Sequence, residues 1–160
     1  MTQMRVQRKG AIFEDTAKAF GLDDVKELKR DVLTAMAEEL VSKSPVDSGT
    51  YVKNHEVKLR SGSFQATGIR DSNAPRRTRG DSVSVSGARS EGLSLLMEDI
   101  AQVDLEAESF VFRNIMGYSK YIEAGVPNRK TSTVPPYAST VREAPRIIQE
   151  VAQKIASRNR

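Results

Sequence analysis

Apolar side chains recur every three or four residues between Phe13 and Lys43, a spacing typical of one face of a helix. The sequence therefore predicts a long helix in this part of the chain, with Gly21 separating it from an earlier helical turn over Phe13–Phe20. Asp24 can cap its start, because Glu27 stands three residues later, as in a capping box. Pro45 predicts its end, because the residue before a proline avoids helical backbone. The face expected to be buried consists of Val25, Leu28, Val32, Met36 and Leu40.

The same periodicity predicts two more long helices. One is expected over residues 90–104, with an acidic outer face, and the last is expected to start at Pro145 because proline is favoured at the first helical position. Tyr118–Glu123 predicts a short helical turn, closed by Gly125 at a position that favours positive φ. A loop over 126–136 separates this turn from the last helix.

Alternating apolar and polar residues predict strands over Tyr51–Leu59 and Ser109–Ile115. Val83 and Val85 predict a third, very short strand. Phe64–Ile69 is expected to pair with the first of these strands as a hairpin. The expected strands thus fall between the first two helices and between the second helix and the helical turn.

This order of elements predicts an α+β fold. We expect an antiparallel sheet packed against a long N-terminal helix and a C-terminal helix, with an inserted acidic helix. The length of 160 residues fits one domain over residues 1–160. Residues 71–80 lack an apolar anchor and carry several arginines, so they predict a mobile basic loop.

The net charge of +4 conceals strong blocks of alternating sign. Residues 53–80 and 129–160 each carry a net +5, whereas residues 91–108 carry −6 and no basic side chain. A uniformly basic surface would suggest nucleic acid as the partner. Alternating blocks instead suggest complementary surfaces between copies or partners, although ordinary solvated surface explains them equally well.

Composition argues against most catalytic chemistry. The chain has no cysteine and one histidine, which excludes disulfides, thiolate sites and histidine clusters. It contains neither of the common glycine-rich phosphate-binding motifs. We therefore predict that the protein is not an enzyme and needs no cofactor or metal. No apolar run approaches the roughly 20 residues that span a bilayer, so a soluble intracellular protein without a membrane partner is expected.

The residues that could still carry chemistry each have a simpler structural explanation. His55 and Glu56 are neighbours on a predicted strand, so their side chains point to opposite faces and do not form a catalytic pair. Adjacent carboxylates on a helix do not converge on one ligand, and solvated helix surface explains them better. These adjacent pairs are Asp23 with Asp24, Glu38 with Glu39, and Glu98 with Asp99.

Two groups of residues are candidates for binding. Arg76, Arg77 and Arg79 can contact phosphates, but no aromatic residue lies among them to stack on bases. Contact with an acidic protein surface explains these arginines at least as well. Three tyrosines in the second half of the chain can either anchor an interface or pack a small core, and the sequence leaves both possibilities open: Tyr118, Tyr121 and Tyr137.

Three short segments, in a fixed order, are more specific than the composition. They are SPVDSGTY at residues 44–51, YSKYIEAG at 118–125 and PPYA at 135–138. Together they resemble the tail-completion, or head–tail joining, family of tailed bacteriophages. The matched positions lie on a framework that runs from the first predicted helix to the last. Residues 62–105 depart from the family pattern, where the basic loop and the acidic helix look like an elaboration.

The resemblance implies structural work in the virion neck. Members of this family form an oligomeric ring that joins the portal or adaptor proteins of the head to the tail terminator or tail tube, and genomic DNA passes through it without specific binding. Assembly would then take place in the host cytoplasm. The residues that we expect at interfaces, as a hypothesis, are Pro45, Asp47, Gly49, Arg76, Arg77, Arg79, Glu98, Asp99, Tyr118, Tyr121, Glu123 and Tyr137.

A second functional class remains open on the sequence alone. The chain could be a small basic nucleic-acid-binding or DNA-packaging accessory protein, which its pI of about 9.4 and its arginine-rich loop favour. Binding that falls steeply with salt would identify that class.

Overall fold

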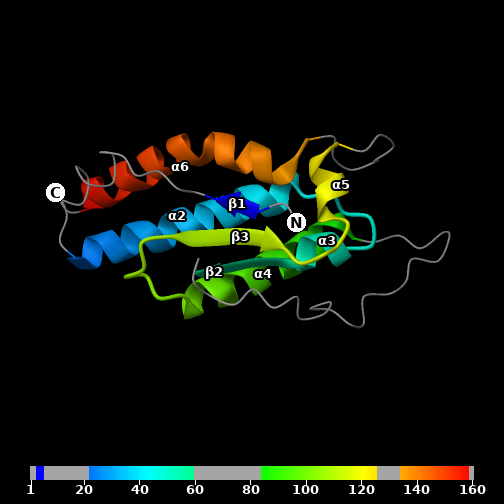
Figure 1. Ribbon diagram of the computed structural model, residues 1–160. Coiled ribbons are helices and arrows are strands. Elements are labelled where there is room, and N and C mark those ends of the chain that lie inside the picture. The colour runs from blue at the N-terminus through cyan, green and yellow to red at the C-terminus, as the bar shows by residue number, and fades with distance from the viewer. Residues whose placement is uncertain (1–2, 6–21, 60–83, 126–133, 159–160) are drawn as a thin grey trace.

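The computed structural model describes residues 3–5, 22–59, 84–125 and 134–158 (Figure 1). The fold is α+β, as the sequence predicts, with an antiparallel sheet packed against long helices. The elements in chain order are β1 (Gln3–Arg5), α2 (Leu22–Lys43), α3 (Thr50–Lys53), β2 (His55–Leu59), α4 (Val85–Gln102), β3 (Phe110–Asn114), α5 (Ser119–Glu123) and α6 (Pro136–Arg158).

The sheet has the strand order β1-β3-β2, so β3 is its central strand. Both neighbours run antiparallel to β3. Val57 of β2 stands opposite Phe112 of β3, and both side chains are buried in the main core. The sequence also predicts a hairpin between Tyr51–Leu59 and Phe64–Ile69, and its second segment lies outside the described residues.

Three long helices lie side by side against the sheet, with α2 contacting both α4 and α6 (Figure 1). An ion pair of 3.0 Å joins Arg158, at the end of α6, to Glu27, near the start of α2, because these two helices run antiparallel. The predicted apolar face of α2 is confirmed as core. Its buried members are Leu28, Val32, Met36 and Leu40, while Val25 is half-buried.

The predicted strand over Tyr51–Leu59 is wrong in its first half. Thr50–Lys53 form one helical turn, α3, and the strand begins only at His55. Gly49 allows this turn, because its φ of 80° lies in the left-handed region that glycine adopts without strain. The Asn54 side chain then closes the turn by donating to the Thr50 carbonyl at 2.6 Å.

The predicted strand at Val83 and Val85 is also wrong where the structure describes it, because Val85 is the first residue of α4. The Ser84 hydroxyl accepts a hydrogen bond from the Gly87 amide at 3.1 Å, which is an N-terminal cap. A local capping bond thus overrides the alternation of valine and serine. The helix predicted over 90–104 is confirmed, with the observed bounds Val85–Gln102.

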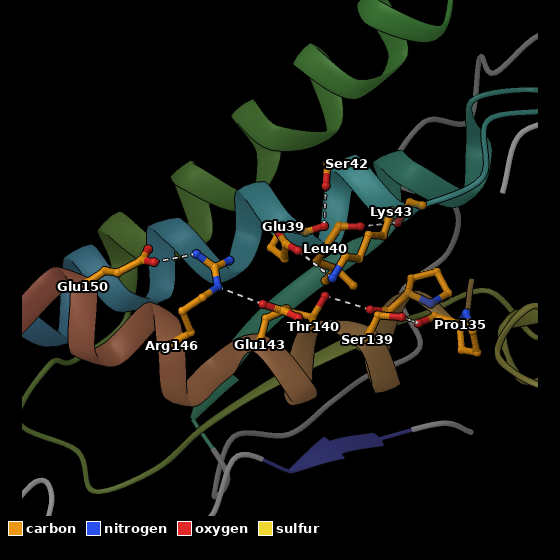
Figure 2. Close-up of polar contacts among 12 residues, drawn as sticks. Glu39, Leu40, Ser42, Lys43, Pro135, Ser139, Thr140, Glu143, Arg146 and Glu150 are labelled. Carbon is orange, nitrogen blue, oxygen red and sulfur yellow. Dashed lines mark hydrogen bonds and ion pairs between the residues drawn. The ribbon is translucent and has the colours of Figure 1, made fainter. Parts of the chain in front are cut away.

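The last helix begins nine residues earlier than predicted, at Pro136, and Pro145 lies inside it. Proline is accepted at 136 for the reason proposed at 145, since the first residues of a helix have no amide partner. Pro145 is on the exposed face of α6, where water can replace the lost hydrogen bond. Ser139 and Thr140 donate back to the carbonyls of Pro135 and Pro136 and tighten the first turn (Figure 2).

Helix ends were otherwise predicted well. α2 ends at Lys43, just before the segment that contains Pro45. Its start is one turn off, because the helix begins at Leu22 and Asp24 lies inside the first turn instead of capping it. α5 ends as expected, with Gly125 at a φ of 73°. The predicted mobile basic loop at 71–80 lies outside the described residues.

Candidate functional site

A buried polar network joins the ends of three elements, with His55 at its centre. The imidazole Nε2 lies 2.8 Å from the hydroxyl of Ser44, which follows α2. Its Nδ1 lies 2.7 Å from the hydroxyl of Tyr137, the second residue of α6. Ser44 and His55 are 0% exposed and Tyr137 is 2% exposed, so the network is closed to solvent.

Counting donors fixes the proton positions in this network. The Ser44 hydroxyl donates to the carbonyl of Leu40 at 2.7 Å, so toward His55 it must accept, and Nε2 carries the imidazole hydrogen. Nδ1 is then an acceptor for the Tyr137 hydroxyl. A neutral histidine satisfies every one of these bonds. Burial lowers the pKa of His55 to about 3, in agreement with this neutral state.

Serine, histidine and tyrosine in one chain of hydrogen bonds also occur in hydrolytic sites, but this arrangement holds the protein together instead. A nucleophilic serine gives its proton to the histidine and must face substrate. Here the Ser44 proton is directed at a helix carbonyl, and the hydroxyl is buried. Burial is also the largest influence that raises the pKa of Tyr137, which keeps its phenol protonated as a donor.

Asn114, at the end of β3, extends the network to the turn before β2. Its side-chain amide donates to the Tyr51 carbonyl at 2.8 Å and lies 3.2 Å from Nδ1 of His55. Its carbonyl oxygen accepts from the Met116 amide at 3.0 Å. The three contacts fix where the chain leaves β3 and turns toward α5.

Glu123, the last residue of α5, caps the beginning of α6. Its carboxylate accepts hydrogen bonds from the backbone amides of Tyr137 at 3.1 Å and Ala138 at 2.7 Å. A carboxylate at this end of a helix is favourable, because the first amides lack partners and the helix dipole is positive there. Glu123 therefore fixes the direction in which α6 leaves the preceding loop.

The structure thus brings together the three segments that carry the family resemblance. Ser44 of the first and Tyr137 of the third both bond His55, while Glu123 of the second holds the backbone of the third. The rings of Tyr51 and Tyr118 lie 6.3 Å apart and connect the first segment to the second. In Figure 1, α3, α5 and the start of α6 accordingly gather at one end of the molecule.

The predicted interface residues fall into different settings at this end. Pro45 is buried, Asp47 is exposed and Gly49 forms the turn before α3. Tyr137 belongs to the buried network. In contrast, Tyr118 is 39% exposed and Tyr121 is 53% exposed, so α5 and the residue before it present two tyrosines to solvent. Lys120 lies over the Tyr121 ring at 4.9 Å.

The two adjacent acidic interface candidates on α4 lie in different settings. Glu98 is exposed. Asp99 is half-buried, and its carboxylate accepts a hydrogen bond from the Val57 amide at 3.2 Å. Val57 lies on β2, an edge strand, so Asp99 covers an amide that faces away from β3. The remaining predicted residues, Arg76, Arg77 and Arg79, lie outside the described part of the chain.

Sequence reasoning did not single out the buried ion pair between Glu56 and Arg113. These residues stand opposite each other on β2 and β3, and a guanidinium nitrogen lies 3.3 Å from the carboxylate. The side chains are 3% and 2% exposed. Breaking such a pair leaves a buried charge, which typically costs about 3–5 kcal/mol. The alternation of β3 predicts which of its residues share a face, but no local signal predicts this partner.

Across residues 24–59, 84–125 and 134–158, no group of three or more histidines or acidic side chains is arranged to hold a metal ion. None of the helices in the described part of the chain is long and apolar enough to span a membrane. A scan against protein-family models and searches of curated proteins and of solved structures give no match to this chain.

Proposed function

We propose that this protein is a structural component of the neck of a tailed bacteriophage, where copies form a ring that joins the portal or adaptor of the head to the tail. One observation supports this proposal above the others. The three segments on which the family resemblance rests, far apart in sequence, are bonded to one another through His55 and Glu123. The resemblance therefore concerns one structural unit and not three unrelated turns.

The exposed residues around this unit suit an assembly role. A ring is built from a head-to-tail contact, in which one face of each copy meets a different face of the next. Exposed tyrosines are frequent anchors of such contacts. Tyr121 lies on α5 and Tyr118 directly precedes it, and the Tyr118 ring lies against Tyr51. The tyrosines would thus meet a neighbour from a fixed position.

Charged side chains are the candidates for the other part of this head-to-tail contact. Of the six acids in residues 91–108, Glu91 and Glu106 pair with Lys53 and Lys26 within the chain, and Asp99 bonds a backbone amide. Among the described residues, Glu98 and Glu108 have no such internal contact. We propose that they face exposed basic side chains of α6, such as Arg142 and Lys154, on a neighbouring copy.

Electron microscopy of particles made without this protein tests the proposal. A phage deleted for the coding gene should produce DNA-filled heads beside finished, unattached tails. Supplying the wild-type chain in trans should restore joined particles, whereas a Tyr121→Ala chain should restore fewer. Tyr121→Phe is the matched control, since it keeps the ring and removes the hydroxyl.

Intact infectious particles from the deletion would overturn the neck assignment. The nucleic-acid-binding alternative would then be examined through DNA affinity at several salt concentrations, because a real DNA binder loses affinity steeply as salt rises.

A further inference from the structure

Strand β1 is a very short edge strand of the sheet. It consists of three residues and, within the described part of the chain, pairs with β3 alone, through the partners Gln3 with Arg113, Met4 with Phe112, and Arg5 with Val111. The next described residue along the chain is Leu22, at the start of α2. β1 is therefore a small piece of the fold, held by one three-residue ladder to β3 and by contact with α6.

β1 pairs with one backbone edge of β3, and this edge would otherwise be open. Val111, Phe112 and Arg113 are buried, at 6%, 1% and 2% exposure. β2 bonds the other side of the same strand, so without β1 these residues would present an open backbone edge. An open edge of this kind binds an added strand through main-chain hydrogen bonds, and the energy gained depends little on which chain provides the strand.

The length of the connection between β1 and α2 determines which copies of β3 the β1 segment can reach. Residues 6–21 join the two elements, and a connection of this length spans at most about 55 Å when fully extended. In Figure 1, β1 lies near the middle of the molecule and α2 begins at the end marked C. The length of α2 itself is about 33 Å, which is shorter than this extended span.

We propose that in the assembled protein the place beside β3 is filled by the β1 segment of a neighbouring copy, so that the copies are joined by an exchanged strand. The inference rests on the self-association required by the proposed ring. An exchanged strand makes the same contacts as the strand in its own chain, so exchange costs little. Once copies are held close together, the exchanged form benefits from a high effective concentration.

Disulfide trapping tests this directly, because the chain has no cysteine of its own. The double variant Arg5→Cys with Val111→Cys places thiols at directly opposed positions of β1 and β3. Opposed residues of an antiparallel pair are close enough for a disulfide. After oxidation of the assembled protein, a non-reducing gel should show most of the chain as linked pairs and longer ladders. Oxidation of dilute, monomeric protein should give a single-chain band.

The matched control uses the other neighbour of the same residue. Lys58 of β2 also stands opposite Val111, so Lys58→Cys with Val111→Cys should give a single-chain band in both states. A second experiment coexpresses Arg5→Cys and Val111→Cys as separate chains with tags of different size. A linked band that contains both tags requires strand exchange, and it does not depend on the double variant folding.

The outcomes separate this inference from the proposed function. An assembly in which Arg5→Cys with Val111→Cys links only within chains overturns strand exchange and leaves the ring intact. A chain that stays monomeric at every concentration by light scattering, with links only within chains, counts against both. Linked chains of both tags in the assembly support both.

Discussion

The hydroxyl of Tyr137 lies 2.7 Å from Nδ1 of His55, although the two residues are separated by 82 positions in the sequence. This bond connects the first turn of α6 to the first residue of β2. Because the other imidazole nitrogen bonds Ser44 at the end of α2, one side chain determines how three elements meet.

Tyr137→Phe should destabilise the protein by about 1–3 kcal/mol, because it removes the hydroxyl from a buried acceptor. Urea unfolding followed by circular dichroism measures the change. Tyr121→Phe is the control, since Tyr121 is 53% exposed, and it should leave the midpoint within experimental error. Equal midpoints for both variants would show that the bond to His55 adds no stability.

Stability should fall as the pH drops below about 6.5. The unfolded chain gains a proton on His55 near its ordinary pKa of about 6.5, whereas burial lowers the pKa of His55 to about 3 in the folded state. Between these values the unfolded state binds more protons, so the free energy of unfolding decreases by about 1.4 kcal/mol per pH unit. Above about 6.5 this contribution is constant.

Comparison with His55→Gln isolates this effect from the carboxylates, which titrate mainly below pH 5. The difference in unfolding free energy between the two proteins should shrink from pH 7 to pH 5. Parallel curves would contradict the prediction. A histidine NMR titration of the folded wild type gives a second measurement, and an imidazole pKa near 6.5 would rule out the buried neutral state.

Glu123→Ala should destabilise the protein by about 1 kcal/mol, because the first amides of α6 lose their acceptor. Glu150→Ala is a suitable control, since it contacts Arg146 on the same helix (Figure 2) and both side chains are more than half exposed. That exposed pair contributes little, typically about 0.3–0.5 kcal/mol. Thermal unfolding of the two variants should rank them in this order, and the reverse order would argue against the cap.

Gly92→Ala should be poorly tolerated. A Cβ at position 92 would lie 2.5 Å from the Val52 carbonyl oxygen, so α3 and α4 would have to move apart. Overpacking of this kind typically costs about 1–3 kcal/mol, even though alanine favours a helix. Gly117→Ala offers the control, because a Cβ there meets nothing within 4 Å. If Gly92→Ala were as stable as Gly117→Ala, the close packing of α3 on α4 would be wrong.

Glu98→Lys should block ring formation without unfolding the chain, because Glu98 is exposed and is proposed to face a basic neighbour. Asp99→Asn should lower the melting temperature, because the Val57 amide loses a charged acceptor. Analytical ultracentrifugation and thermal unfolding separate the two effects. Gln102→Lys, also exposed on α4, controls for added positive charge, and normal rings from Glu98→Lys would refute the charge pairing.

Periodicity predicted the helices of the core well, because burial of one face determines both the pattern and the packing. It failed where a few local bonds decide the backbone. The Ser84 cap makes a helix from alternating valine and serine, and the bond from Asn54 to the Thr50 carbonyl makes a turn where a strand was expected. Pro136 and Pro145 are equally acceptable as the first residue of the last helix on sequence grounds, and α6 begins at Pro136, where Glu123 caps its first amides.

The tyrosines show what sequence reasoning about the site could not decide. Residue type left open whether they pack a core or anchor an interface, and the structure buries Tyr137 while it exposes Tyr118 and Tyr121. Tyr137 bonds His55 and Tyr118 lies against Tyr51, and both of these partners are distant in sequence. Likewise, adjacency on α4 could not reveal that Asp99 reaches β2 while Glu98 points outward.

The buried network around His55 needs Tyr137 of the last helix, so it can be completed only late in synthesis. A nascent chain that has emerged only as far as α5 contains His55 and Ser44, but Nδ1 lacks its phenolic donor and Glu123 has no helix to cap. The end of the molecule that carries Tyr118 and Tyr121 therefore lacks these bonds until α6 leaves the ribosome. In the proposed ring, each copy would then acquire its final binding geometry only after α6 has been made, and unfinished chains would stay out of the assembly.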